Sequence, residues 1–285
     1  MDGIYVVADY GQVGDLAWTE LRIALASQCR GWQMFSTVVP KFNTPAAGFV
    51  AAQIARGLDR INACILINVD PRTDNRKVVR DGAGAPFVCA VLDNGVLVFS
   101  PNAGYSLAFL KSRIKNLYIL HNGGANGQFR SRDLFPGLMA QVERTGFVGF
   151  QKFDLAKIPD PPTQVVGYVD GYGNVKTTMT RSQARVAGWR PGKKMYVMMG
   201  SRRKVEVHCA ASIMGVLPGQ LALAPGSSGD KNNPYMELAV RATGPSCVRS
   251  GAHSLSFPQP GTKFDLQSVA KVSASKKVSK RAVRA

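Results

Sequence analysis

The stretch GIYVVADYG, residues 3–11, decides the fold of the first half of the chain. Ile4–Ala8 is a short apolar run rich in β-branched residues, which is typical of a buried strand. The run stops at Asp9, so this strand is expected to enter a turn that carries polar groups. Apolar residues at helical spacing follow over Leu16–Ala26. A strand, a polar turn and a helix in this order predict an α/β unit.

Strand and helix patterns continue to alternate through the first half of the chain. A second helix is expected over Ala46–Leu58, with Thr44 as its N-cap and Pro45 at its first position. The Asn-Gly pair at 94–95 is a strong turn signal between two strand-like runs. This alternation predicts an α/β domain over residues 1–158, with a mixed sheet and flanking helices. The further strands expected here are Cys64–Val69, Phe87–Leu92 and Val96–Phe99.

The sequence changes character after Ile158. Residues 159–162 read Pro-Asp-Pro-Pro, which is stiff and helix-breaking, so residues 159–163 are expected to form a linker. Beyond the linker, short strand-like runs separated by turn residues predict a smaller β-barrel-like or sandwich domain over residues 164–267. The strands expected there are Gln164–Val169, Val175–Met179, Lys194–Met199, Val205–Ala210, Gln220–Ala224 and Tyr235–Ala242.

The 285-residue chain is strongly basic, with 36 Lys and Arg against 18 acidic residues and a formal net charge of +18. Hydrophobic residues make up 45% of the chain, which is enough for a sizeable core and excludes a wholly disordered protein. Residues 268–285 form a basic tail without acidic residues. Such a tail either binds RNA or another polyanion through counterion release, or is a solvated, solubilising segment. The candidate polyanion contacts are Lys271, Lys276, Lys277, Lys280, Arg281 and Arg284.

The five cysteines and three histidines show no metal-ligand spacing, and no metal site is expected. The cysteines lie mostly in apolar stretches without a CxxC pair, so we expect buried thiols in a reducing compartment. The N-terminus lacks the pattern of a signal peptide, and no uncharged apolar run is long enough to span a bilayer. These features predict a soluble protein of the cytoplasm or another reducing intracellular compartment, without a membrane partner.

Four aspartates each follow a strand-like run and stand beside Gly, Pro or Asn. In an α/β sheet, ligands bind at the carboxyl ends of the strands. Carboxylates there would clamp a ribose diol, hold a ligand ammonium or bind a metal. The alternative is that Asp is simply a good turn former after a strand. The four residues are Asp9, Asp70, Asp93 and Asp170.

Short motifs around these aspartates resemble, in the same order, motifs of the S-adenosylmethionine hydroxide adenosyltransferases and the related fluorinase and chlorinase enzymes. Each motif is short, but the ordered set covers roughly residues 4 to 243. The matching segments are 9–11 for TDFG, 69–76 for VDPGVG…R, 93–95 for PDNG, 129–135 for FHGRDIF, 170–174 for IDRFGN, and 226–229 with 235–239 for NSSGYLEIA.

This resemblance implies an N-terminal α/β domain, a C-terminal β-barrel-like domain and a homotrimer, with the ligand between one subunit's first domain and a neighbour's second. The implied substrate is S-adenosyl-L-methionine, and no metal takes part. A nucleophile attacks C5′ of the ribose and expels methionine, which leaves adenosine or a 5′-haloadenosine. Water or hydroxide is expected in preference to halide, because the halogenase-type loop is absent around residues 70–76. Positioning and desolvation of the nucleophile would be the main contribution of the protein.

The substrate contacts that the resemblance implies are carboxylate, amide, hydroxyl and aromatic side chains. Asp9 would accept hydrogen bonds from both ribose hydroxyls, and Asn174 would recognise adenine. Asp170, with Asp15 as a further candidate, would pair with the methionine ammonium. Two adjacent serines would bind the methionine carboxylate. The full set is Asp9, Asp15, Phe129, Asp170, Asn174, Ser227 and Ser228.

The residues that activate the nucleophile depart from the family pattern. Hydroxide-transferring members use an Asp–Arg–His set, of which Asp70 and Arg76 are retained, whereas Arg130 stands at the histidine position. A guanidinium stays protonated, so Arg130 cannot take a proton from water, although it can hold an anionic nucleophile or a phosphate. Ser131, where hydroxide enzymes have Gly, is similar to the halide-contacting serine of the fluorinase.

Two functions therefore stay open. The first is an enzyme that cleaves S-adenosylmethionine, favoured by the retained substrate contacts. The second is a catalytically degenerate member of the family that serves as a basic structural or RNA-associated subunit of a large assembly. Arg130 and the basic tail favour the second function. Residues 41–46, which lack the His and Asp of the family HxIxPxD segment, and Thr177-Thr178 in place of TN are further departures.

Overall fold

Two compact units make up the computed structural model of the protein: one spans Met1–Pro161 and the other begins at Pro162. The division falls within residues 159–163. Each unit is built around its own sheet and its own apolar core. The structure describes residues 1–11, 14–58, 62–71, 84–121, 129–200, 204–244 and 249–269.

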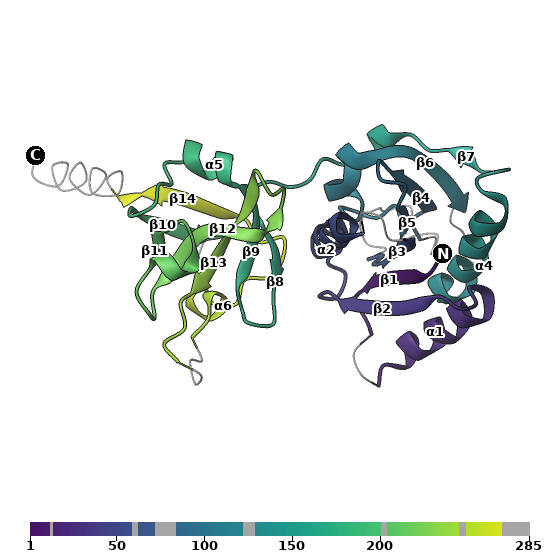
Figure 1. The fold of residues 1–285 in the computed structure, drawn as a ribbon, viewed down its shortest axis with the longest axis horizontal. Helices are drawn as coiled ribbons and strands as arrows, with labels where there is room; N and C mark the ends of the chain where they lie inside the picture. The colour runs from purple at the N-terminus through teal and green to yellow at the C-terminus, as the bar shows by residue number, and fades with distance from the viewer. Residues whose placement is uncertain are drawn as a thin grey trace, which may run out of the picture. The chain divides into compact units, whose positions relative to one another are not determined.

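A seven-stranded mixed sheet forms the first unit, in the order β2-β1-β3-β5-β4-β6-β7 (Figure 1). The first four strands in this order run parallel to one another, and the other three join through antiparallel pairs. The expected strands near residues 4–8, 64–69, 87–92 and 96–99 are present. The bounds are β1 Gly3–Ala8, β2 Gln33–Val38, β3 Ala63–Asn68, β4 Phe87–Leu92, β5 Leu97–Pro101, β6 Ile114–His121 and β7 Gln151–Lys152.

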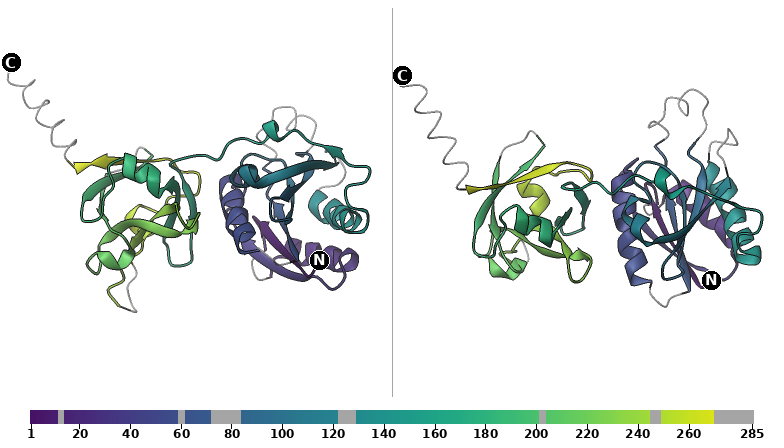
Figure 2. Two further views of the ribbon diagram at one scale, coloured as in Figure 1. Left: turned by 45° about the horizontal axis from the view of Figure 1, so that its top comes forward. Right: turned by 90° about the horizontal axis from the view of Figure 1, so that it is seen from above.

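Helices cover both faces of this sheet (Figure 2). On one face, α1 and α4 pack together over side chains that alternate along β1, such as Ile4 and Val6. On the other face, α2 packs against β1, β3 and the 3-10 helix η1. Burial on both faces explains why the central strands are continuous apolar runs. The bounds are α1 Leu16–Gln28, α2 Thr44–Gly57, η1 Ala108–Arg113, α4 Arg130–Thr145 and η2 Leu155–Lys157.

Helix α2 begins at Thr44, one residue before Pro45, which was expected at its first position. The prediction of Thr44 as the N-cap is therefore wrong. Asn43 has a non-helical backbone, and its side chain accepts a hydrogen bond from the amide of Ala46 at 2.9 Å. Thr44 is already helical, and its hydroxyl instead accepts a bond from the amide of Tyr105 at 3.1 Å. Both residue types are good caps, and the backbone dihedrals decide between them.

The second unit is a seven-stranded mixed sheet that curls into a half-barrel, in the order β14-β10-β11-β12-β13-β9-β8. Backbone hydrogen bonds join the starts of the two edge strands, β8 and β14. The amide of Val166 donates to the carbonyl of Thr262 at 2.9 Å, and the amide of Phe264 donates to the carbonyl of Gln164 at 3.0 Å. These bonds cover backbone groups that would otherwise form open edges. The bounds are β8 Val166–Val169, β9 Val175–Thr180, β10 Lys194–Met199, β11 Val205–Cys209, β12 Leu221–Gly229, β13 Pro234–Val240 and β14 Phe264–Ser268.

Short helices lie between strands of the second unit. A buried tryptophan belongs to the apolar core of this unit. Trp189 is buried, and its indole N–H donates to the carbonyl of Leu223 at 2.9 Å. Strand β8 starts at Val166 rather than Gln164, because Gln164 has a positive φ of 54° that is incompatible with a strand. The short helices are α5 Arg181–Val186, η3 Ile213–Gly215 and α6 Gly251–Ser254.

The described cysteines are buried and unbonded, as the sequence led us to expect. Burial raises the pKa of the Cys29 and Cys209 thiols to about 11, which keeps them protonated and unreactive at neutral pH. In the described part of the chain, no helix combines the length and apolar character needed to cross a membrane. Cys247, Arg76 and the six basic tail residues from Lys271 to Arg284 lie outside the described residues.

Candidate functional site

Two aspartates meet at the carboxyl edge of the first sheet. Strands β1 and β3 run parallel with Ala8 opposite Asn68, so Asp9 and Asp70 leave neighbouring strands at the same edge. The amide of Phe42 donates to the Asp9 carboxylate at 2.8 Å. Burial raises the pKa of Asp9, and the nearby negative charge of Asp70 raises it further. This edge of the sheet therefore holds two carboxylates that interact electrostatically.

Arg130 supplies a positive charge at this edge. It is the first residue of α4, and only 2% of it is exposed. Its guanidinium donates to the carbonyl of Ala85 at 2.6 Å and lies over the ring of Phe87, 4.5 Å from the ring centroid. The amide of Ala85 in turn donates to the Asp70 carboxylate at 3.3 Å. Asp70 and Arg130, both expected in the site, are thus joined through the backbone of one residue.

Gly84 makes this arrangement possible. A Cβ at position 84 would overlap the Arg130 guanidinium and would lie 2.7 Å from a carboxylate oxygen of Asp70. The two charged groups therefore occupy the space that any other residue's side chain would need. Gly84 and Ala85 belong to no motif, so the sequence offered no signal for them.

A half-buried tyrosine, Tyr10, holds Ser131 and Phe129 near the same edge. The Tyr10 hydroxyl bonds to both the Ser131 hydroxyl and the Asn68 amide, and the Phe129 ring meets the Tyr10 ring edge-on at 5.8 Å. Burial raises the pKa of Tyr10, so its hydroxyl stays protonated. Five of the expected residues, from two strand ends and one helix, thus gather around this edge. They are Asp9, Asp70, Phe129, Arg130 and Ser131.

Asp15 has a structural role that accounts for its residue type. It is the N-cap of α1, where one carboxylate oxygen accepts a bond from the amide of Ala17 at 2.9 Å. The other oxygen accepts a bond from the amide of Gly11 at 3.1 Å. Asp15 therefore ties the turn after β1 to the start of α1, and its pairing with a ligand ammonium stays a prediction.

Asp93 does not share the carboxyl edge with Asp9 and Asp70, and the expectation that it does is wrong. It follows β4, which runs antiparallel to β5, so it lies at the opposite edge of the sheet. Its carboxylate accepts two bonds from Arg113, at 2.8 and 3.0 Å. These bonds lower the pKa of Asp93. An apolar run before an aspartate does not reveal the direction of the strand.

In the second unit, Asp170 and Asn174 form the tip of the β8–β9 hairpin. One Asp170 oxygen accepts bonds from the amides of Tyr172 and Asn174, both at 3.0 Å. The other oxygen accepts the Asn174 side-chain amide at 3.2 Å. The turn-forming explanation of Asp170 is therefore correct for its first oxygen, while the second faces the neighbouring side chains.

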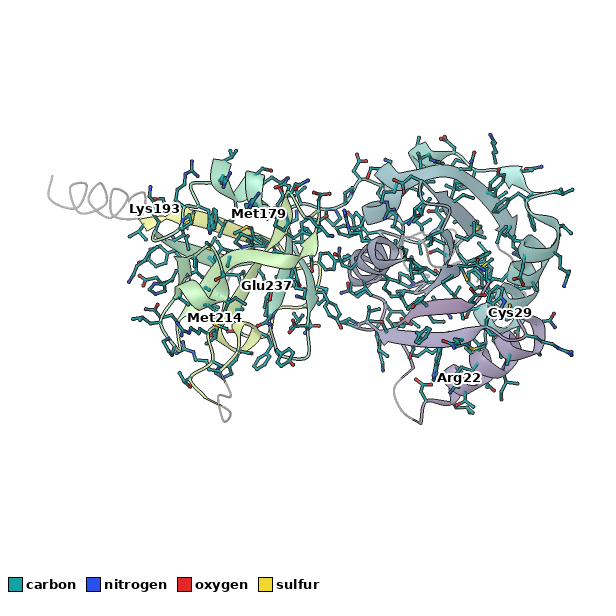
Figure 3. The ribbon with its side chains drawn as sticks, viewed as in Figure 1. Arg22, Cys29, Met179, Lys193, Met214 and Glu237 are labelled. Carbon is teal, nitrogen blue, oxygen red and sulfur yellow. The ribbon has the colours of Figure 1, made fainter. Side chains whose placement is uncertain are left out.

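Lys176 connects this hairpin to two further residues of the second unit. Its ammonium lies 3.5 Å from Asp170, 3.1 Å from Glu237 and 3.4 Å from the Ser227 hydroxyl. The Lys176 and Glu237 side chains are only 15% and 7% exposed, and Glu237 is labelled on β13 in Figure 3. We call Asp170, Lys176, Ser227 and Glu237 the Lys176 cluster.

The Lys176 cluster carries one more carboxylate than it has ammonium groups, so it favours a further cation. Lys176 and Glu237 were missed by the sequence analysis. Glu237 lies within the YMELA segment that matches the family motif, which was the available signal. Ser228 is buried beside Ser227. Across the described residues, no three His, Cys, Asp or Glu side chains lie close enough together to hold a metal ion.

Neither a protein-family model nor a curated protein matches the chain. Solved structures do match it. An uncharacterized conserved protein from Thermotoga maritima is 16% identical, with a TM-score of 0.67 over 92% of this chain and 99% of that one. A conserved hypothetical protein from Thermus thermophilus is 17% identical, with a TM-score of 0.62 over 93% of this chain and 100% of that one. At such low sequence identity, the similarity establishes a shared fold and gives no information about the activity of this chain.

Replacing Asp70 by Asn is expected to lower the pKa of Asp9, because a negative neighbour disfavours ionisation of a buried carboxyl. An NMR titration of the Asp9 carboxyl carbon in both proteins measures this shift. Asp93→Asn, at the opposite edge of the sheet, is the matched control and should leave the titration of Asp9 unchanged. An Asp9 pKa that stays constant or rises in Asp70→Asn contradicts the arrangement.

Replacing Lys176 by Met should lower the free energy of unfolding of the second unit by roughly 3–5 kcal/mol, because it leaves the buried Glu237 carboxylate without its partner. Adding Glu237→Gln should recover part of the loss, with a coupling energy of about 1–3 kcal/mol in a denaturation double-mutant cycle. Lys194→Met, which breaks the exposed pair with Glu206, should cost less than about 1 kcal/mol. Additive effects of the Lys176 and Glu237 changes would show that the two groups do not interact.

Proposed function

We propose that the protein cleaves S-adenosyl-L-methionine at the bond between C5′ and sulfur, giving adenosine and methionine. One observation carries the proposal: the Asp9 and Asp70 carboxylates and the Arg130 guanidinium lie at the same carboxyl edge of the first sheet. These are positions at which the motifs resemble those of the adenosyltransferases. Ligand sites of α/β sheets lie at such edges.

The proposed reaction needs little covalent help, since a sulfonium is a good leaving group. The oxygen of water forms a bond to C5′ while the C5′–S bond breaks and its electron pair passes to sulfur. Methionine leaves as a neutral thioether, and one proton of the attacking water must depart. Asp70 is the acceptor of that proton in this scheme, because Arg130 stays protonated. Arg130, held by Ala85 and Phe87, donates hydrogen bonds that orient the attacking oxygen while its proton passes to Asp70.

Side chains other than Asp70 and Arg130 would bind the substrate. Asp9 accepts hydrogen bonds from the ribose hydroxyls, and its burial strengthens them. The Lys176 cluster, with its excess carboxylate, binds the methionine ammonium, and Ser227 with Ser228 binds the carboxylate. Asn174 recognises adenine. A homotrimer and a cytoplasmic location belong to the same proposal.

A second candidate function rests on Arg130 itself. Its guanidinium is buried against the Ala85 carbonyl and the Phe87 ring, which is also how a purely structural arginine is held. This use favours a catalytically inactive protein that keeps the fold and serves as a basic, RNA-associated subunit of an assembly. Residues Lys271, Lys276, Lys277, Lys280, Arg281 and Arg284 would then supply the polyanion contacts.

Incubation of the full chain with S-adenosylmethionine in water enriched in oxygen-18 tests the proposal. Chromatography with mass detection should find methionine and an adenosine whose 5′-hydroxyl carries the label. Asp9→Asn should lower kcat/KM by at least about tenfold, because a neutral amide accepts the ribose hydroxyls more weakly. The matched control Asp93→Asn should leave it unchanged.

The other outcomes decide between the two functions. Absence of both turnover and calorimetric binding of S-adenosylmethionine removes the enzyme proposal. Binding without turnover favours the inactive alternative, for which deletion of residues 271–285 should abolish salt-sensitive retention of RNA. Unlabelled adenosine would mean that water is not the nucleophile.

A further inference from the structure

A cavity of about 400 Å³ opens on the second unit, lined by residues outside the Lys176 cluster. It lies between the turn before β10, the end of β11, the η3 segment and the residue that follows β13. Its volume falls within the range of small-molecule sites. The residues that carry the inference are Lys193, His208, Met214, Leu217 and Arg241.

Nitrogen-bearing side chains from three elements converge on this cavity. The Arg241 guanidinium donates to the carbonyls of Val216 at 2.7 Å and Met214 at 3.2 Å, which fixes it against the wall. Lys193, on an exposed turn, and His208, on β11, also line the cavity. Basic side chains that line one cavity favour the binding of an anion.

Acidic groups are scarce around the cavity. No Asp or Glu is among the described residues that line it. The Glu206 carboxylate lies 3.8 Å from the lining residue His208, and its shorter contact, 2.7 Å, is with Lys194. The positive potential of the cavity is thus largely uncompensated from within the described part of the unit.

An apolar wall completes the cavity. Met214 and Leu217, on and just after η3, are 72% and 67% exposed and line the cavity. Met214 and Lys193 are both labelled in Figure 3. An unbranched thioether adapts its shape to a ligand, so Met214 suits a flat or irregular apolar group. The cavity therefore offers cations for one end of a ligand and apolar surface for the other.

We propose that this cavity binds a small phosphate monoester with an apolar or aromatic body. A dianionic phosphate matches the converging lysine, arginine and histidine donors better than a single carboxylate charge does. A small ester is favoured over nucleic acid, because no Phe, Tyr or Trp is among the described lining residues on which a base would stack.

Titration of the full chain with phenyl phosphate, followed by calorimetry and by NMR of labelled methionine methyl groups, tests this inference. Saturable binding should shift the Met214 methyl signal, identified by its loss in Met214→Leu. Lys193→Gln should weaken binding by about tenfold or more. Lys194→Gln, the neighbouring residue bonded to Glu206, removes the same charge outside the cavity and should have no such effect. Asp9→Asn, in the other unit, should also leave binding unchanged.

Each contrary result overturns the inference. Binding that is not saturable, a Met214 signal that does not move, or equal weakening by Lys193→Gln and Lys194→Gln would each show that only the general positive charge attracts the ligand. Binding of a short RNA but not of phenyl phosphate would assign the cavity to nucleic acid instead. Lys193 is exposed, so its substitution should change binding without unfolding the unit.

Discussion

The parallel register of β1 and β3 is the constraint from which the candidate site follows. Ala8 stands opposite Asn68, and the chain then turns on both strands into an aspartate. Burial at this edge raises the pKa of Asp9, and the neighbouring negative charge of Asp70 raises it further. The Arg130 guanidinium at the start of α4 is joined to Asp70 through the backbone of Ala85, which bonds to both side chains. Gly84 leaves the space in which Arg130 and Asp70 come together, so the charges and the backbone depend on one another.

In the second unit, two carboxylates also lie close together, and a lysine ammonium lies near both. Antiparallel pairing of β9 with β13 places Lys176 opposite Glu237, and Lys176 also reaches Asp170 at the hairpin tip. A lysine between two carboxylates reduces the cost of burying them. The remaining negative charge makes this cluster attractive to a cationic group, whereas the cavity near Arg241 in the same unit, proposed to bind a phosphate, is lined by basic side chains. One small sheet thus carries two surfaces of opposite preference.

Much of the fold could be predicted from apolar runs and turn signals, because β1, β3 and the β4–β5 hairpin are buried and continuous. Strand β2 was missed, since it is an edge strand with many exposed side chains and therefore lacks an apolar run. Helix α4 was missed because it contains Pro136, which is typical of a break, and starts with charged residues. Asp93 was expected at the wrong edge of the sheet, because the sequence does not show that β4 runs antiparallel to β5. The contact between Lys176 and Glu237 joins residues 61 positions apart. Local sequence reveals neither feature, because both depend on how strands pair.

We expect the carboxyl edge of the first sheet to bind the nucleoside part of S-adenosylmethionine. A crystal structure of the protein grown with adenosine, the proposed product, is the sharpest test of this site. Both ribose hydroxyls should lie within hydrogen-bonding distance of the Asp9 carboxylate, with C5′ facing Asp70 and Arg130. Adenosine bound elsewhere, with water alone against Asp9, would contradict it.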